Sequence, residues 1–196
     1  YPSLGSYVTA LVELMEHLGH RSVYVFAAGL SGCFAVALAA REAGLVRRVA
    51  LDGLPMVRSR DRKLYARKYC PPIVPDRHGA YLQQAWHQLR GEEASWPWFD
   101  RSAAAARRHD PDLDPHRLQS RLVDVLRQLP SYGDAAKAAL EGAVRDILGG
   151  VRQPVLLFEA AEDVLYAGTR RAARRLSSAR VVPRPTDLAS RAGVQP

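Results

Sequence analysis

The residues best placed for chemistry lie in a turn of small side chains between an apolar run and an alanine-rich stretch. Residues 23–26 are apolar or aromatic, and the sequence then reads Ala-Ala-Gly-Leu-Ser-Gly over positions 27–32. A second apolar run at 49–51 stops at Asp52, so the pattern predicts a strand, a tight turn, a helix and a second strand parallel to the first. Ser31 supplies a hydroxyl in this turn, which could act as a nucleophile if a neighbouring base took its proton.

The segments on either side of the turn are expected to build a sheet that positions it. Four apolar runs predict parallel strands in sequential order with helices on both faces, that is, an α/β fold. They lie near residues 23–27, 48–52, 154–158 and 180–183. The stretch between the second and third runs carries helix-start signals and proline breakers, and one of its helices is expected to run from near Ser131 to Gly149 and Gly150. The sequence therefore predicts a core at 1–54 and 150–196 with a helical insertion at 55–149.

The turn resembles the nucleophile elbow of the α/β-hydrolase superfamily, in which a small-x-nucleophile-x-small-small turn lifts one side chain above the sheet. If the strand covers residues 23–26, the resemblance puts Ala27 at the first small position, Gly29 at the nucleophile position and Ser31 at the next small position. The backbone amide of Leu30 then takes the place of an oxyanion-hole donor. The nucleophile side chain is missing in this register. With φ above zero at this position, a glycine relieves about 1–3 kcal/mol of backbone strain that a serine would carry.

A second register places Ser31 at the nucleophile position, with Gly29-Leu30-Ser31-Gly32-Cys33 matching G-x-S-x-small. It puts the bulky Phe34 where helix and strand approach closely, whereas the first register keeps bulk out of the turn. In the first register Ser31 is expected in the first helical turn, with its hydroxyl bonded to the backbone or packed against the strand. The two registers therefore differ in whether the hydroxyl is free to react.

The other members of a serine-hydrolase triad are only partly recognisable. By the same resemblance Asp163 matches the acid after the seventh strand of the family, with Asp52 as a weaker alternative, and Asp163 could equally be a loop or cap residue. The family shows a Gly-His after its eighth strand, but residues 184–190 read Arg-Pro-Thr-Asp-Leu-Ala-Ser. The histidines at 78, 87, 109 and 116 all fall in the insertion. The resemblance thus implies a hydrolase-family chain that is inactive as a serine hydrolase.

By the same resemblance, the helical insertion corresponds to the cap that covers the pocket of these enzymes. The chain is expected to hold the C-terminal part of the family sheet, because it starts on a segment similar to the helix before the elbow strand. Five aromatic residues of the insertion could line a capped pocket, although packing within the cap is the alternative. They are Trp86, Trp96, Trp98, Phe99 and Tyr132.

Two functions remain open from the sequence. The resemblance implies hydrolysis of small ester-like or related apolar substrates, as in relatives of the superfamily. The alternative is a non-catalytic relative that binds a small ligand or a protein partner. Residues 51–55, Leu-Asp-Gly-Leu-Pro, and 96–98, Trp-Pro-Trp, resemble a bacterial subgroup whose elbows carry residues other than serine. In such a subgroup Gly29 would be a shared variation.

Composition narrows the expected partners. The net charge is +8, but the 28 basic residues are spread through every segment without an aromatic stacking motif, so no nucleic-acid partner is expected. Cys33 and Cys70 lack the spacing of a metal site, and no run of 18 apolar residues indicates a membrane span. We therefore expect a cytoplasmic protein with no metal, cofactor or membrane partner. A small-molecule substrate or ligand is expected, together with self-association if the strand from Val23 to Ala27 forms an open edge.

Overall fold

The computed structural model describes residues 1–107 and 110–185. These residues form two compact units, a sheet unit and a helical unit. Among the described residues, the sheet unit contains 3–57 and 142–185, and the helical unit contains 1–2, 58–107 and 110–141.

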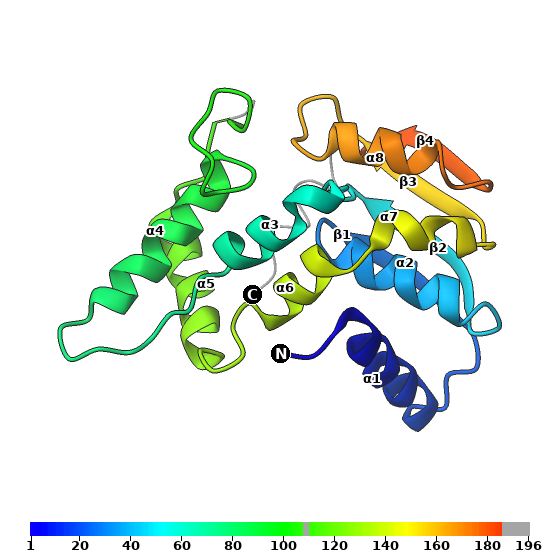
Figure 1. Ribbon diagram of the computed structural model, residues 1–196, viewed down its shortest axis with the longest axis horizontal. Coiled ribbons are helices and arrows are strands. Elements are labelled where there is room, and N and C mark those ends of the chain that lie inside the picture. The colour runs from blue at the N-terminus through cyan, green and yellow to red at the C-terminus, as the bar shows by residue number, and fades with distance from the viewer. Residues whose placement is uncertain (108–109, 186–196) are drawn as a thin grey trace. The chain divides into compact units, whose positions relative to one another are not determined.

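Four parallel strands in the order β1-β2-β3-β4 form the sheet unit's centre (Figure 1). They are β1 (Val23–Ala28), β2 (Val46–Asp52), β3 (Val155–Glu159) and β4 (Ala179–Pro183). Each predicted strand is confirmed to within two residues at either end, because buried parallel strands are near-continuous apolar runs. The parallel register brings the carboxyl ends of all four strands to one edge.

The sheet unit's core lies where helices pack against the strands. Its helical segments are α1 (Leu4–His17), α2 (Ser31–Arg41), α7 (Val144–Ile147), the short η2 (Leu148–Gly150) and α8 (Tyr166–Ala173). Helix α2 contacts β1 and β2, helix α8 contacts β3 and β4, and both α1 and α7 pack against α2. Leu51 and Leu157 are fully buried in this core. Gly32 allows α2 to lie close to Leu54, since a Cβ at position 32 would lie 2.8 Å from Cδ1 of Leu54.

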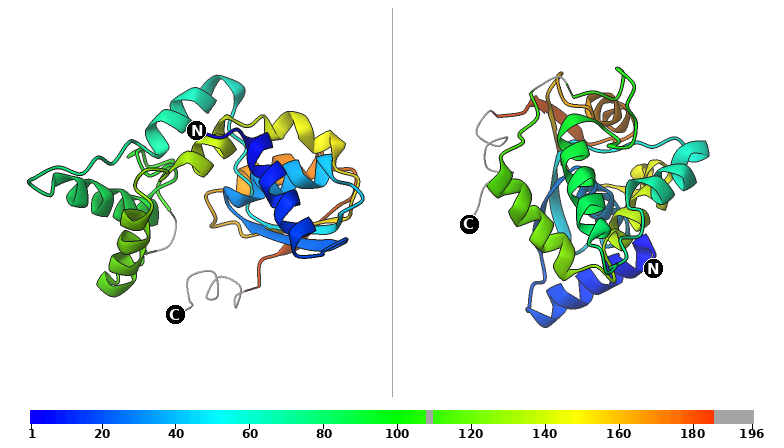
Figure 2. Two further views of the ribbon diagram at one scale, coloured as in Figure 1. Left: turned by 90° about the horizontal axis from the view of Figure 1, so that it is seen from below. Right: turned by 90° about the vertical axis from the view of Figure 1, so that its left-hand side faces the viewer.

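The helical unit consists of two packed helix pairs (Figure 2). Its segments are η1 (Ser59–Asp61), α3 (Arg62–Tyr69), α4 (Ala80–Ala94), α5 (Pro115–Arg127) and α6 (Asp134–Glu141). Helix α3 packs against α6, and α4 packs against α5 around a small apolar core. Helix α5 begins where its capping residues predict. The Asp114 carboxylate accepts a hydrogen bond from the amide of Arg117 at 2.8 Å, and proline occupies the first turn.

One predicted helix is wrong. The segment expected to run as one helix from near Ser131 to Gly149 and Gly150 forms three pieces, α6, α7 and η2, with a break after Glu141. Gly142 lies at that break, where glycine disfavours helix continuation. The pieces after the break pack against α2, so they belong to the sheet unit.

No helix in the described residues is long and apolar enough to cross a membrane.

Candidate functional site

A sharp turn joins β1 to α2 at Gly29. Gly29 has φ +57°, the left-handed conformation that the first register expects at the nucleophile position. Its amide donates to the carbonyl of Asp52 at 2.9 Å, and its own carbonyl accepts from the amide of Gly32 at 3.1 Å. A Cβ added at Gly29 would meet nothing within 4 Å. The backbone of an elbow is therefore present, with open space where its side chain would begin.

Ser31 is the first residue of α2, two residues beyond the turn's left-handed position. Its hydroxyl donates to the carbonyl of Ala28 at 2.8 Å and accepts from the Ala28 amide at 3.0 Å. Both hydrogen bonds hold the hydroxyl against its own turn, which is the structural role expected in the first register. The amide of Leu30 follows Gly29 directly, just before the N-terminus of α2.

The carboxyl ends of β2, β3 and β4 carry an ion cluster of Asp52, Arg184 and Asp163. Asp52 ends β2, Asp163 follows β3, and Arg184 directly follows β4. Nε of Arg184 donates to Oδ1 of Asp52 at 2.5 Å, and its second guanidinium nitrogen Nη2 donates to Oδ2 of Asp163. The side chains of Asp52, Asp163 and Arg184 are 8%, 15% and 18% exposed. Both acids are candidates from the sequence, whereas the arginine that joins them was not predicted.

Both carboxylate oxygens of Asp163 accept hydrogen bonds. Its Oδ1 accepts the amide of Leu165 at 2.7 Å, while Oδ2 contacts Arg184. Burial would lower the pKa of Arg184, but the hydrogen bonds and negative charges of Asp163 and Asp52 outweigh it and raise that pKa. A guanidinium has donors and no acceptor, so Arg184 cannot serve as a base. Residues 186–190, where the sequence departs from the Gly-His of the family, lie outside the described residues.

Three of the aromatic candidates pack together around Tyr69 in the helical unit. The indole N–H of Trp98 donates to the carbonyl of Tyr69 at 2.6 Å, and the ring of Trp96 lies 5.0 Å from that of Tyr69 in an edge-on arrangement. Phe99 stacks edge-on against Trp98 at 6.1 Å and against Tyr65 at 5.6 Å. These rings have packing partners within the unit, and their part in lining a ligand pocket stays a prediction.

Trp86 and Tyr132 pack against the apolar core between α4 and α5. Beside them lies a buried polar network that the sequence analysis missed. Gln88, 1% exposed, donates to the hydroxyl of Tyr132 at 2.5 Å and to Oε1 of Glu92 at 3.2 Å. Glu92 pairs in turn with Arg121 at 2.7 Å. A polar residue at a core-facing helical position, here Gln88, is the signal that could have found this network.

Three of the four histidines of the insertion lie in the described part of the helical unit. His78, His87 and His116 are exposed residues of the helical unit, and His109 lies outside the described residues.

Several solved structures share the architecture of this chain. An α/β-hydrolase enzyme from a Medee basin deep-sea metagenome library aligns with a TM-score of 0.63 at 15% identity, over 97% of this chain and 69% of its own. The enol-lactonase from Burkholderia xenovorans aligns with a TM-score of 0.62 at 20% identity, over 98% of this chain and 70% of its own. A bromoperoxidase from Bacillus anthracis aligns with a TM-score of 0.67 at 12% identity, over 92% and 65% of the two chains.

No family model and no curated protein matches the sequence. The parallel sheet, the elbow between β1 and α2 and these structural neighbours together define the fold. The chain has the α/β-hydrolase fold.

Proposed function

We propose that this chain is a hydrolase-family protein whose elbow lacks a nucleophile, so that it does not hydrolyse esters by the serine mechanism. The main support is Gly29, which occupies the left-handed position between β1 and α2 where a nucleophile side chain would stand. The structural neighbours named as a hydrolase and a lactonase support a hydrolase origin. Small ester-like or related apolar molecules are the substrate class of that origin.

The chemistry of the remaining groups supports the loss of turnover. A serine nucleophile needs a base to take its proton and an acid to orient that base. The hydroxyl of Ser31 is bonded to the Ala28 backbone on both its donor and acceptor sides, and Asp163 is paired with Arg184. Loss of a triad nucleophile lowers kcat by about 10⁶ in a measured protease. Hydrolysis by this chain is therefore expected at the background rate.

The test compares p-nitrophenyl acetate and butyrate hydrolysis by the unaltered chain, by Ser31→Ala and by Gly29→Ser. All three should show the same rate as buffer with an equal concentration of denatured protein. Gly29→Ser has space for its side chain but still lacks a base, so it controls for the nucleophile alone. Turnover by the unaltered chain that Ser31→Ala abolishes would overturn the proposal.

The second candidate function is non-catalytic binding of a small ligand or a protein partner. The open space at Gly29 favours it, because a ligand can approach the strand ends without meeting a nucleophile side chain. Gly29→Asn fills that space with a residue that tolerates the left-handed backbone. Calorimetry with butyramide, which resists hydrolysis, should then show heat of binding for the unaltered chain and none for Gly29→Asn. Equal heats for both proteins would count against a ligand at the elbow.

A further inference from the structure

Four exposed arginines lie on α8 and in the turn that follows it. They are Arg170, Arg171, Arg174 and Arg175. Arg170 pairs with Glu159 at 3.2 Å, and Arg171 donates to the carbonyl of Met56 at 3.4 Å. In the part of the chain that the structure describes, no acidic side chain pairs with Arg174 or Arg175. The guanidinium groups of these last two arginines are therefore available to another anion.

Ser177 follows the available pair of arginines at a fixed spacing. The sequence reads Arg-Arg-Leu-Ser over positions 174–177. Ser177 is the one serine or threonine of the sequence that has arginine at both the second and the third position before it. It is exposed in the turn between α8 and β4, and its hydroxyl makes no hydrogen bond with any described residue.

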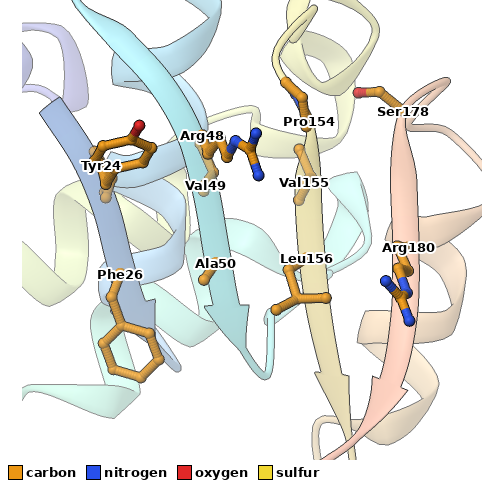
Figure 3. Close-up of a pocket in the computed structure, with 11 residues that line it drawn as sticks. Tyr24, Phe26, Arg48, Val49, Ala50, Pro154, Val155, Leu156, Ser178 and Arg180 are labelled. Carbon is orange, nitrogen blue, oxygen red and sulfur yellow. The ribbon is translucent and has the colours of Figure 1, made fainter. Parts of the chain in front are cut away.

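Two other serines have an arginine three positions before them, and local structure holds both. Ser178 donates its hydroxyl to the carbonyl of Gln153, and Figure 3 shows its side chain turned toward the start of β3. Ser120 lies within α5, and its preceding Arg117 already pairs with acids of the helical unit. Of the three serines, Ser177 alone combines an unbonded hydroxyl, unpaired arginines and a position outside a helix.

We propose that Ser177 is a phosphorylation site for a protein kinase that recognises the two arginines before it. Such a kinase places carboxylates against the guanidinium groups of its substrate, and this charge pattern gives its specificity. The γ-phosphoryl group of ATP moves to Oγ of Ser177. The bond from the γ-phosphorus to the β,γ-bridging oxygen breaks, the bond to Oγ forms, ADP leaves, and a carboxylate base of the kinase accepts the hydroxyl proton.

The modification changes the charge at the end of α8. A phosphoserine carries about −1.5 to −2 charges at pH 7 and three strong acceptor oxygens. At position 177 the phosphate stands two residues from Arg175 and three from Arg174, whose guanidinium groups can donate to it. Phosphorylation would therefore bring the charge of this segment from two positive charges to near neutrality. This switch is independent of the chemistry at the elbow.

The turn must open locally before a kinase can bind it in an extended form. Leu176, between the arginines and the serine, is only 6% exposed, and its amide donates to the carbonyl of Ala172 at 3.1 Å. Local opening of this kind is common in turns and at helix ends. A synthetic peptide of residues 170–182 needs no such opening, so it should react faster than the folded chain.

The test incubates the folded chain with magnesium, ATP and the catalytic subunit of the cyclic-AMP-dependent protein kinase, which selects Arg-Arg-x-Ser. The peptide of residues 170–182 shows that the kinase is active. Intact-protein mass spectrometry should detect one phosphoryl group on the unaltered chain, and fragmentation should place it on Ser177. Ser177→Ala should take up none, and Arg174→Gln/Arg175→Gln should react at least about tenfold more slowly.

A matched variant separates recognition of the arginines from net charge. Arg170→Gln/Arg171→Gln removes the same two charges from α8 outside the recognised positions, and it should be phosphorylated as fast as the unaltered chain. Far-UV circular dichroism of each variant confirms that it is folded.

Three results would overturn the proposal. The first is a folded chain that takes up no phosphoryl group while the peptide is labelled. The second is labelling of Ser178 or Ser120 in place of Ser177. The third is equal slowing by the two double variants, which would show that the kinase responds to net charge and not to the arginines at 174 and 175.

Discussion

Arg184 joins the carboxyl ends of three strands, and replacing it by methionine should destabilise the sheet unit. Methionine keeps an unbranched apolar stem and removes the charge. The substitution leaves the carboxylates of Asp52 and Asp163 without their shared cation, at 8% and 15% side-chain exposure. Two effects then add: each carboxylate loses charge-assisted hydrogen bonds, and the two negative charges repel each other.

The magnitude follows from how buried the cluster is. Removing one partner of a fully buried ion pair costs about 3–5 kcal/mol, and removing one from an exposed pair costs about 0–1 kcal/mol. The Arg184 side chain is 18% exposed, which places the cluster near the buried end. We expect Arg184→Met to lower the free energy of unfolding by about 2–4 kcal/mol at pH 7.

Urea unfolding followed by two spectroscopic probes separates a loss of stability in the sheet unit from one in the helical unit. All three tryptophans, at 86, 96 and 98, lie in the helical unit, so their fluorescence reports that unit, and far-UV circular dichroism reports both. Arg184→Met should shift the dichroism transition and leave the fluorescence transition in place. The control variant Arg170→Met breaks the ion pair between Arg170 and Glu159, in which the arginine side chain is 46% exposed. It should lower the free energy of unfolding by no more than about 1 kcal/mol. Equal losses for the two variants would refute the clamping role of Arg184.

Three other predictions concern the helical unit, a helix contact and the sheet edge. Burial raises the pKa of Glu92 above its ordinary 4.5 against the lowering effect of Arg121, so the folded state binds more protons than the unfolded state. The stability of the helical unit should therefore fall as the pH rises from 4.5 through the raised pKa. Glu92→Gln should flatten that dependence in tryptophan-monitored unfolding, and an unchanged slope would contradict this prediction. Gly168→Ala should destabilise by about 1–3 kcal/mol in thermal unfolding, because its Cβ would lie 2.4 Å from the carbonyl oxygen of Leu54, whereas Gly149→Ala, with nothing within 4 Å, should not; equal effects would contradict the close contact. Because β1 pairs only with β2 among the described strands, we expect dimers through its other edge, and a stable monomer in sedimentation at micromolar concentration would count against this.

The strands could be predicted from the sequence because each is marked locally. Residues 49–51 and 155–158 are continuous apolar runs that end at or near an acid, and buried parallel strands need such runs. The turn at Gly29 could also be predicted from the sequence, because a glycine among small residues between a strand and a helix readily adopts the left-handed conformation that such a turn requires. The break at Gly142 was missed because a single glycine in a helical pattern is often tolerated.

The ion cluster was harder to predict because it depends on contacts far apart in the sequence. Asp52 and Arg184 are separated by 132 positions and meet only when β2, β3 and β4 pair in parallel register. Arg184 directly follows the last predicted strand, but nothing in the local sequence pairs it with the two acids. A polar residue at the end of each of three adjacent parallel strands was the available signal.

The absence of a nucleophile at the elbow is tested most directly by a fluorophosphonate probe and intact-protein mass spectrometry. The probe forms a stable adduct with a serine activated by a neighbouring base, and Ser31 has its hydroxyl bonded to the backbone of Ala28 instead. We expect no adduct on the unaltered chain at any time at which a serine hydrolase control is fully labelled. Stoichiometric labelling that Ser31→Ala abolishes would contradict it, because Ser31 would then be the nucleophile and Gly29 would not mark the elbow.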